Sequence, residues 1–292
     1  MSGKSALCES GRGMRKACIV GWPVGHSRSP MIYKYWLKHH GIDGDYVKEA
    51  VSPDDIDAFL ADLSGRGYVG CNITVPHKGA AFRAIQVKLP PAVACGSANL
   101  LWSQDGELHG TNTDTFGFMT NLTLTVPDWN RPDAAAVVLG AGGSTRTVLY
   151  GLLDAGVTQI RLTNRTRANA EKLAQQFDPA GTKIKVVDWA DRSEAVRDAS
   201  VVINTTTLGM KGAGTPGIDF SGADRRTVVA DMVYVPLETD FLADARQAGL
   251  RTVDGLGMLL HQAVPAFETY FGTRPTVTPE LRALVVADLV GS

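Results

Sequence analysis

Short apolar runs alternate with helical spacing along the first part of the chain. The runs at 17–21, 46–51 and 69–75 are bounded by polar or glycine-containing turns, as is typical of buried strands. Helical spacing follows each of them, at 30–40, from Ser52 as an N-cap before Pro53, and from Pro76. Residues 98–102 and 107–110, joined across Asp105-Gly106, predict a hairpin. This alternation predicts an α/β unit with a mostly parallel sheet.

A second series of apolar runs begins after the break at 125–132. Runs at 135–139, 159–163, 183–187, 200–203, 227–231 and 250–253 predict the strands of another sheet. Two helical patterns, 257–271 and 279–290, have no strand that would join them to that sheet, so we expect them to pack on the first unit. The predicted domains are therefore 15–114 with 255–292, and 115–254, with 1–14 as a disordered extension. A cleft between two such domains is a natural binding site.

A glycine turn, Gly140-Ala141-Gly142-Gly143, lies between the predicted strand 135–139 and a helical pattern at 148–153. Such a turn lets the backbone approach a pyrophosphate and points helix N–H groups at it. Thr145 replaces the third glycine of the usual pattern, so the glycines alone are a weak signal.

The end of the next strand makes the cofactor prediction more specific. A site for NAD usually carries an acidic residue there, whereas this chain has Asn164-Arg165-Thr166-Arg167. Two cations at a helix start are unfavourable unless an anion lies nearby. The pair therefore favours a 2′-phosphate, and hence NADP.

Composition narrows the class of protein. With 44% hydrophobic residues, 20% charged residues and a net charge of −1, the chain has no basic excess that would favour nucleic acid or an anionic membrane. No apolar run approaches the roughly 20 residues of a membrane helix, and residues 1–13 lack the apolar core of a secretion signal. Cys8, Cys18, Cys71 and Cys95 have neither CxxC spacing nor neighbouring histidine pairs. We therefore expect reduced thiols, no metal site and a cytoplasmic location.

Polar side chains gather at the ends of the predicted strands of the first unit. Ser27 and Ser29 can hold a carboxylate through their hydroxyls, although Ser29 alone could simply cap the following helix. Thr74 lies at the end of the third strand, the helix that follows brings Lys78 to the same edge, and Asp114 follows the hairpin, where it could instead cap a helix. A Lys–Asp pair suits carbonyl reduction, because the lysine delivers a proton while the carboxylate keeps the ammonium oriented.

Nine segments, in the same order, resemble the shikimate dehydrogenase family, and their substrate and cofactor motifs match independently. Together they span residues 17–270: GWPVGHSRSP at 21–30, NITVPHK at 72–78, GSANL at 96–100, GTNTD at 110–114, GAGGSTR at 140–146, NRT at 164–166, INTTTLGM at 203–210, DMVY at 231–234 and DGLGMLLHQA at 254–263.

The resemblance implies a substrate domain, a Rossmann domain for NADP and the reversible NADPH-dependent reduction of 3-dehydroshikimate to shikimate in aromatic amino-acid biosynthesis. It implies that Lys78 and Asp114 are the catalytic pair. The substrate residues that it implies are Ser27, Ser29, Thr74, Lys78, Asn99, Asp114, Tyr234 and Gln262. The cofactor residues that it implies are Gly140, Ala141, Gly142 and Gly143 at the pyrophosphate, Asn164, Arg165 and Thr166 at the 2′-phosphate, and Thr206, Met232, Gly255 and Met258 at the nicotinamide.

Four positions depart from the family pattern. Ala98 stands where valine is common, Leu100 where threonine is usual, and Leu208 where a small polar residue is usual. Asn169 occupies the place of a second phosphate-binding arginine, for which Arg167 is the candidate substitute. The strength of the preference for NADP over NAD therefore stays open.

Three alternatives remain at this point. They are a quinate/shikimate dehydrogenase that uses NAD or NADP, an aminoshikimate enzyme, and a non-catalytic dinucleotide sensor. A sensor should have lost Lys78 or Asp114, and both are present. We expect a small-molecule substrate, no nucleic acid or membrane partner, and a monomer or homodimer.

Overall fold

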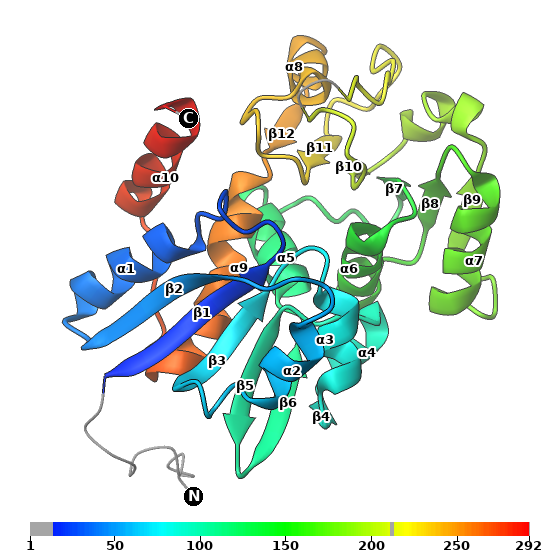
Figure 1. The fold of residues 1–292 in the computed structure, drawn as a ribbon. Helices are drawn as coiled ribbons and strands as arrows, with labels where there is room; N and C mark the ends of the chain where they lie inside the picture. Colours follow the sequence, from blue (N-terminus) through cyan, green and yellow to red (C-terminus); the bar gives the residue numbers. More distant parts are fainter. Residues whose placement is uncertain (1–13, 211–212, 292) are drawn as a thin grey trace, which may run out of the picture.

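The computed structural model describes residues 14–210 and 213–291, which form two six-stranded sheets covered by helices (Figure 1). The first sheet has the order β2-β1-β3-β5-β6-β4. Its strands are β1 (Arg15–Gly21), β2 (Gly44–Ala50), β3 (Tyr68–Ile73), β4 (Val87–Lys88), β5 (Leu100–Gln104) and β6 (Glu107–Thr111). Only β5 runs antiparallel to its neighbours, because it forms the predicted hairpin with β6. The prediction of a mostly parallel sheet is confirmed.

Helices cover both faces of this sheet, because alternate side chains of its strands point to opposite sides. Ala17 and Ile19 of β1 pack with α1 (Ser29–His40), α9 (Leu256–Phe271) and α10 (Pro279–Gly291). Cys18 and Val20 pack on the other face with α2 (Ile56–Ala61), α3 (Lys78–Ala84) and α4 (Pro90–Cys95). The two C-terminal helices thus return to the first sheet, where their apolar faces are buried.

The second sheet is fully parallel, with the order β12-β11-β10-β7-β8-β9. Its strands are β7 (Ala136–Leu139), β8 (Ile160–Thr163), β9 (Ile184–Val187), β10 (Val201–Asn204), β11 (Val228–Asp231) and β12 (Arg251–Val253), each of which begins one residue later than predicted. Helices α5 (Asp114–Thr125), α6 (Gly143–Asp154) and α7 (Arg167–Phe177) cover one face. Helix α8 (Asp240–Gln247) and two short 3-10 turns, 189–191 and 194–196, cover the other. The strand order reverses between β7 and β10, which is the ligand-binding point of a Rossmann sheet.

Helix α5 joins the two halves through close packing on α9. A Cβ atom added at Gly117 would lie 2.6 Å from the carbonyl oxygen of Met258, and one added at Gly257 would lie 1.7 Å from Oδ1 of Asn121. Position 117 therefore requires glycine, because the atoms in the way are backbone, whereas a side chain at position 257 would displace the Asn121 amide. This approach brings Asp114, at the start of α5, beside Gln262 of α9.

Two predicted helix starts are wrong. Ser52 does not cap α2, which begins at Ile56, because its hydroxyl bonds the carboxylate of Asp55 at 2.5 Å and residues 53–55 form a turn. The helix predicted from Pro76 begins at Lys78, after a turn closed by the N–H of His77 on the carbonyl of Thr74 at 2.9 Å. Such short turns are a common alternative wherever a side chain or carbonyl near the helix start finds another partner.

Three further features concern only the described residues. None of their helices is long and apolar enough to cross a membrane, and no three of their acidic, histidine or cysteine side chains group as metal ligands. Cys18, Cys71 and Cys95 are buried free thiols. Cys8 and the predicted extension up to residue 13 lie outside the described residues, and Met14 is exposed just before β1.

Candidate active site

A pocket of about 240 Å³ opens where the carboxyl ends of strands from the two sheets face each other. It is lined by every residue predicted to contact the substrate: Ser27, Ser29, Thr74, Lys78, Asn99, Asp114, Tyr234 and Gln262. Of the residues predicted at the nicotinamide, Met232, Gly255 and Met258 line it as well. The fold therefore gathers residues that are distant in sequence into one cavity.

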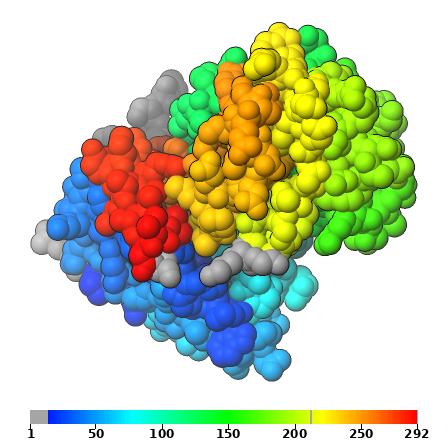
Figure 2. All heavy atoms as spheres, turned by 90° about the horizontal axis from the view of Figure 1, so that it is seen from above, coloured from blue at the N-terminus to red at the C-terminus, as the bar shows by residue number. Residues whose placement is uncertain are grey.

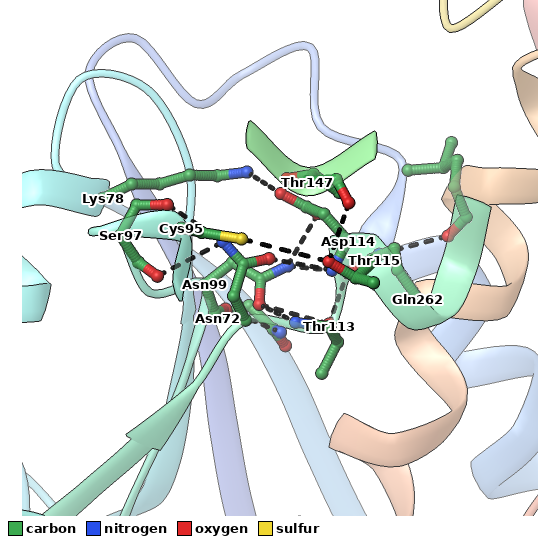
Figure 3. A network of polar contacts seen from close by, with 12 residues as sticks. Asn72, Lys78, Cys95, Ser97, Asn99, Thr113, Asp114, Thr115, Thr147 and Gln262 are labelled. Atoms are coloured by element: carbon green, nitrogen blue, oxygen red, sulfur yellow. Dashed lines mark hydrogen bonds and ion pairs between the residues drawn. The ribbon is translucent and has the colours of Figure 1, made fainter. Parts of the chain in front are cut away.

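Lys78 and Asp114 form an ion pair inside this pocket (Figure 3). Nζ of Lys78, the first residue of α3, lies 2.5 Å from Oδ2 of Asp114, the first residue of α5. The second carboxylate oxygen, Oδ1, accepts from Nδ2 of Asn99 at 2.8 Å. Only 15% of the Asp114 side chain and 32% of the Lys78 side chain are exposed, so the pair is screened from water without being sealed. The Asp114 side chain does not cap α5.

A network of buried polar groups holds the Asp114 carboxylate in this orientation. Oδ1 of Asn99 accepts from the backbone N–H of Thr113 at 2.7 Å, and the N–H of Asp114 donates to Oδ1 of Asn112 at 3.0 Å. Asn112 in turn donates to the hydroxyl of Ser97 at 3.0 Å. Ser97, Asn112 and Thr113 were not among the residues predicted to act in the site. The only feature of the sequence that pointed to these residues was the high density of polar side chains in GSANL and GTNTD.

Asn72 and Gln262 flank the same network (Figure 3). Oδ1 of Asn72 accepts from the hydroxyls of Tyr33 and Tyr46 at 2.9 and 2.8 Å, and its amide donates to the carbonyl of Asn99. Burial raises the pKa of both tyrosines, so they remain donors. Oε1 of Gln262 lies 3.4 Å from Nδ2 of Asn99, so two amides point into the pocket side by side.

Hydroxyl groups form another part of the pocket lining. Ser29 is buried at the start of α1, and its N–H donates to the hydroxyl of Ser27 at 3.3 Å. Thr74 follows β3, and Tyr234 follows β11 from the other sheet. Burial raises the pKa of Tyr234, which keeps its hydroxyl protonated, while the charge of Arg28 acts in the opposite direction. Neutral donors close to a cation are a suitable cradle for a carboxylate.

The glycine turn has the geometry that a pyrophosphate requires. Gly140 has a φ of 111°, and a Cβ atom there would lie 2.7 Å from the hydroxyl of Thr205. Within the described residues, Cβ atoms added at Gly142 and Gly143 would meet nothing within 4 Å, and the N-cap residue Gly142 has no side chain that could accept from a helix N–H group. Open space thus lies before the N–H groups at the start of α6, which fits an anion. Thr145 supports the turn, since its hydroxyl accepts from the N–H of Gly142 at 2.9 Å.

The residues predicted at the 2′-phosphate follow β8. The amide of Asn164 bonds the carbonyl of Thr166 at 2.9 Å, and the Arg165 and Thr166 side chains are exposed. Arg167 already has two carboxylate partners, Glu171 at 2.7 Å from its Nε and Asp188 at 2.6 Å from its Nη1. Its charge is therefore largely compensated before any phosphate arrives.

A second polar network lies next to the residues that are predicted to contact the nicotinamide. Oδ1 of Asp231 accepts from Nδ2 of Asn204 at 2.9 Å, and Oδ1 of Asn204 accepts from the hydroxyl of Thr206 at 2.7 Å. Burial raises the pKa of Asp231 to about 6. Thr206 is thereby fixed beside the sheet edge, although it is not part of the pocket lining.

Leu100, which replaces a usual threonine, is buried in the core cluster with Leu256.

Comparisons with known proteins agree on one family. The model described as the shikimate dehydrogenase substrate binding domain matches residues 19–101, and that of shikimate / quinate 5-dehydrogenase matches residues 126–210. The shikimate dehydrogenase (NADP(+)) of Azorhizobium caulinodans is 51% identical over 276 residues, which cover 94% of this chain and 97% of that protein.

Solved structures lead to the same family. The shikimate 5-dehydrogenase of Thermus thermophilus in complex with NADP(H) and shikimate has a TM-score of 0.81 and 29% identity, over 94% of this chain and all of that chain. The quinate dehydrogenase of Corynebacterium glutamicum in complex with NAD has a TM-score of 0.85 and 28% identity, over 94% of this chain and 99% of that chain. By its sequence, its fold and its matched domains, this chain belongs to the shikimate dehydrogenase family.

Proposed function

We propose that this protein is an NADP-dependent shikimate dehydrogenase, which reversibly reduces 3-dehydroshikimate to shikimate in aromatic amino-acid biosynthesis. One observation carries the proposal. The Lys78–Asp114 ion pair lies in the same pocket as the Ser27 and Ser29 hydroxyls, and this pocket extends to Ser144 beside the glycine turn. A ring acid and a dinucleotide can therefore meet there, as the names of the relatives suggest.

Lys78 and Asp114 are the proposed acid–base pair. NADPH, when bound, supplies the hydride that adds to the carbonyl carbon of the substrate. The Lys78 ammonium donates a proton to the carbonyl oxygen in reduction, and its neutral amine accepts the proton of the hydroxyl in oxidation. The Asp114 carboxylate, 2.5 Å away, holds the lysine toward the oxygen.

The remaining pocket residues orient the ring. The hydroxyls of Ser27, Ser29, Thr74 and Tyr234 bind the substrate carboxylate, and Tyr234 donates because burial keeps its pKa high. The amides of Asn99 and Gln262 hold the ring hydroxyls at the end of the pocket next to Asp114. Because different residues bind the carboxylate and the ring hydroxyls, the ring binds in one orientation, which places the reacting oxygen at Lys78.

The proposed cofactor site runs along the edge of the second sheet. Gly140, Ala141, Gly142 and Gly143 form the pyrophosphate turn, and Thr206, Met232, Gly255 and Met258 form the nicotinamide end. Asn164, Arg165 and Thr166 bind the 2′-phosphate. Arg165 is the main cation of this group, because Arg167 is paired with two carboxylates.

A quinate/shikimate dehydrogenase that also uses NAD is the second candidate. The compensated charge of Arg167 and the similarity to an NAD-bound quinate dehydrogenase favour it. Steady-state assays with shikimate and quinate, each with NADP and NAD, separate the two. We expect shikimate with NADP to give the highest kcat/KM. Comparable turnover of quinate with NAD would overturn the main assignment, and no turnover of either acid would favour the dinucleotide sensor.

The cytoplasmic location stays a prediction from composition and cysteine usage. The monomeric or homodimeric state is a prediction as well. The domain division at 15–114 with 255–292, and 115–254, is consistent with the two sheets, while α5 packs on helices of both halves.

A further inference from the structure

The last helix, α10, lies on the outside of the molecule against two segments that reach the pocket. Its apolar side is buried, with Leu281 and Val285 both fully covered in the cluster that contains α1 and α9. Seen from above, the red α10 lies against the blue N-terminal part of the chain (Figure 2). Its polar side carries two ion pairs, one to each of these segments.

The first ion pair joins α10 to the serine loop. Oδ2 of Asp288 lies 2.9 Å from Nε of Arg28, and only 14% of the Arg28 side chain is exposed. Arg28 stands between Ser27 and Ser29, lines the pocket and, as the residue before α1, accepts the N–H groups of Met31 and Ile32 on its carbonyl. A contact that holds Arg28 therefore holds the backbone that carries both serine hydroxyls.

The second ion pair joins α10 to the turn before α9. Nη2 of Arg282 lies 2.6 Å from Oδ2 of Asp254, whose Oδ1 accepts from the N–H of Leu256 at 3.0 Å. The carbonyl of Asp254 also accepts from the amide of Asn121 at 2.8 Å. The next residue, Gly255, lines the pocket at the proposed nicotinamide end.

We propose that α10 is a positioning element for both ends of the pocket: Asp288 sets the serine loop for the substrate carboxylate, and Arg282 sets the Asp254–Gly255 turn for the cofactor. This inference rests on the proposed function. Neither residue touches the pocket, so each acts only through its partner. Without the Asp288 carboxylate or the Arg282 guanidinium, the adjoining backbone segment loses one of the contacts that fix its position.

The two ends of the pocket can be tested separately, because each variant is expected to weaken the binding of a different ligand. Asp288→Asn should raise the KM and the calorimetric Kd for shikimate about threefold to tenfold, with the Kd for NADP unchanged. Arg282→Gln should weaken NADP by a similar factor in a calorimetric titration without substrate, and leave the Kd for shikimate unchanged. Asp288→Glu and Arg282→Lys should restore most of the affinity, because they keep the charge.

A matched control breaks an ion pair that lies away from the pocket. Glu268→Gln removes the exposed pair with Arg274, 2.5 Å apart at the far end of α9, and should change neither affinity. Thermal unfolding of every variant checks that the fold is retained. Arg28→Gln combined with Asp288→Asn should be no worse for shikimate than Arg28→Gln alone, since Asp288 acts through Arg28.

Several results would overturn the inference. They are unchanged affinities in both variants, equal effects on both ligands, additive effects in the double variant, or a lower KM for shikimate in Asp288→Asn, which would mean that Asp288 competes with the substrate for Arg28. These outcomes leave the proposed function standing if the wild type oxidises shikimate. If the wild type oxidises neither shikimate nor quinate, the proposed function fails, and this inference fails with it.

Discussion

Nζ of Lys78 lies 2.5 Å from Oδ2 of Asp114, although 36 residues and three strands separate the two in the chain. Each is the first residue of its helix: α3 follows β3 after a short turn, and α5 follows the hairpin of β5 and β6. The pairing therefore depends on strand order, because β5 and β6 bring the start of α5 back beside β3. Its proposed role is proton transfer.

Lys78→Ala should lower kcat for shikimate oxidation about 100-fold or more, with a much smaller change in KM, because a general acid–base group acts mainly in the transition state. Asp114→Asn should act in the same direction. Steady-state kinetics measure both variants. Lys88→Ala, on the neighbouring β4, is the control and should behave as the wild type. Near-normal turnover of Lys78→Ala would contradict the proton-transfer role.

Arg165→Ala should raise the KM for NADP about tenfold or more and leave the KM for NAD nearly unchanged. Charge-assisted hydrogen bonds to a phosphate contribute about 1.5–3 kcal/mol, and only NADP carries the 2′-phosphate. Arg197→Ala, which breaks an exposed pair with Glu194, is the control. If both cofactors weaken equally, Arg165 does not contact the phosphate.

Asp188→Asn should raise the preference for NADP over NAD about twofold to fivefold. The substitution removes one of the two carboxylates that compensate Arg167, and exposed ion pairs contribute up to about 1 kcal/mol. The ratio of kcat/KM for the two cofactors measures the effect, with Glu194→Gln as control. An unchanged ratio would show that the Arg167 charge lies too far from the ribose to matter.

Asp231→Asn should alter how stability depends on pH. Burial raises the pKa of Asp231 from 3.8 to about 6, so the folded state binds this proton more tightly than the unfolded state does. The stability of the wild type relative to the variant is therefore highest below pH 4 and falls as pH rises to 6. The fall amounts to about 3 kcal/mol at most. Urea unfolding between pH 4 and 7 measures it, and parallel curves for the two proteins would refute the assignment.

Gly117→Ala should destabilise the protein by about 1–3 kcal/mol, because the new methyl group would lie 2.6 Å from the Met258 carbonyl. Gly79→Ala is the matched control, since a Cβ atom there meets nothing nearer than 3.9 Å. It should be neutral or slightly stabilising, as alanine favours a helix. Thermal unfolding compares the two. Equal stabilities would mean that α5 and α9 can separate without cost.

The local pattern of apolar and polar residues determined many of the strands and motifs of this protein. Alternation of apolar runs located the strands of the second sheet to within one residue, and the glycine turn and the NRT segment marked the edge at which we propose that a dinucleotide binds. These features depend on interactions between residues close in sequence, so they can be read from the chain. The helix starts at Ser52 and Pro76 were misplaced, because short turns compete with helix capping at those points.

Only the tertiary structure decided which charged side chains form ion pairs with one another. Nothing in the sequence pairs Arg167 with Asp188, or Arg28 with Asp288 across 260 residues. Nor does it show that Thr145 supports the turn whose third glycine it replaces. Such contacts depend on strand order and on the close packing of α5 against α9, which bring distant residues within a few ångströms. Sequence alone thus determined the elements and the chemical groups, and the packing of those elements decided which groups act together.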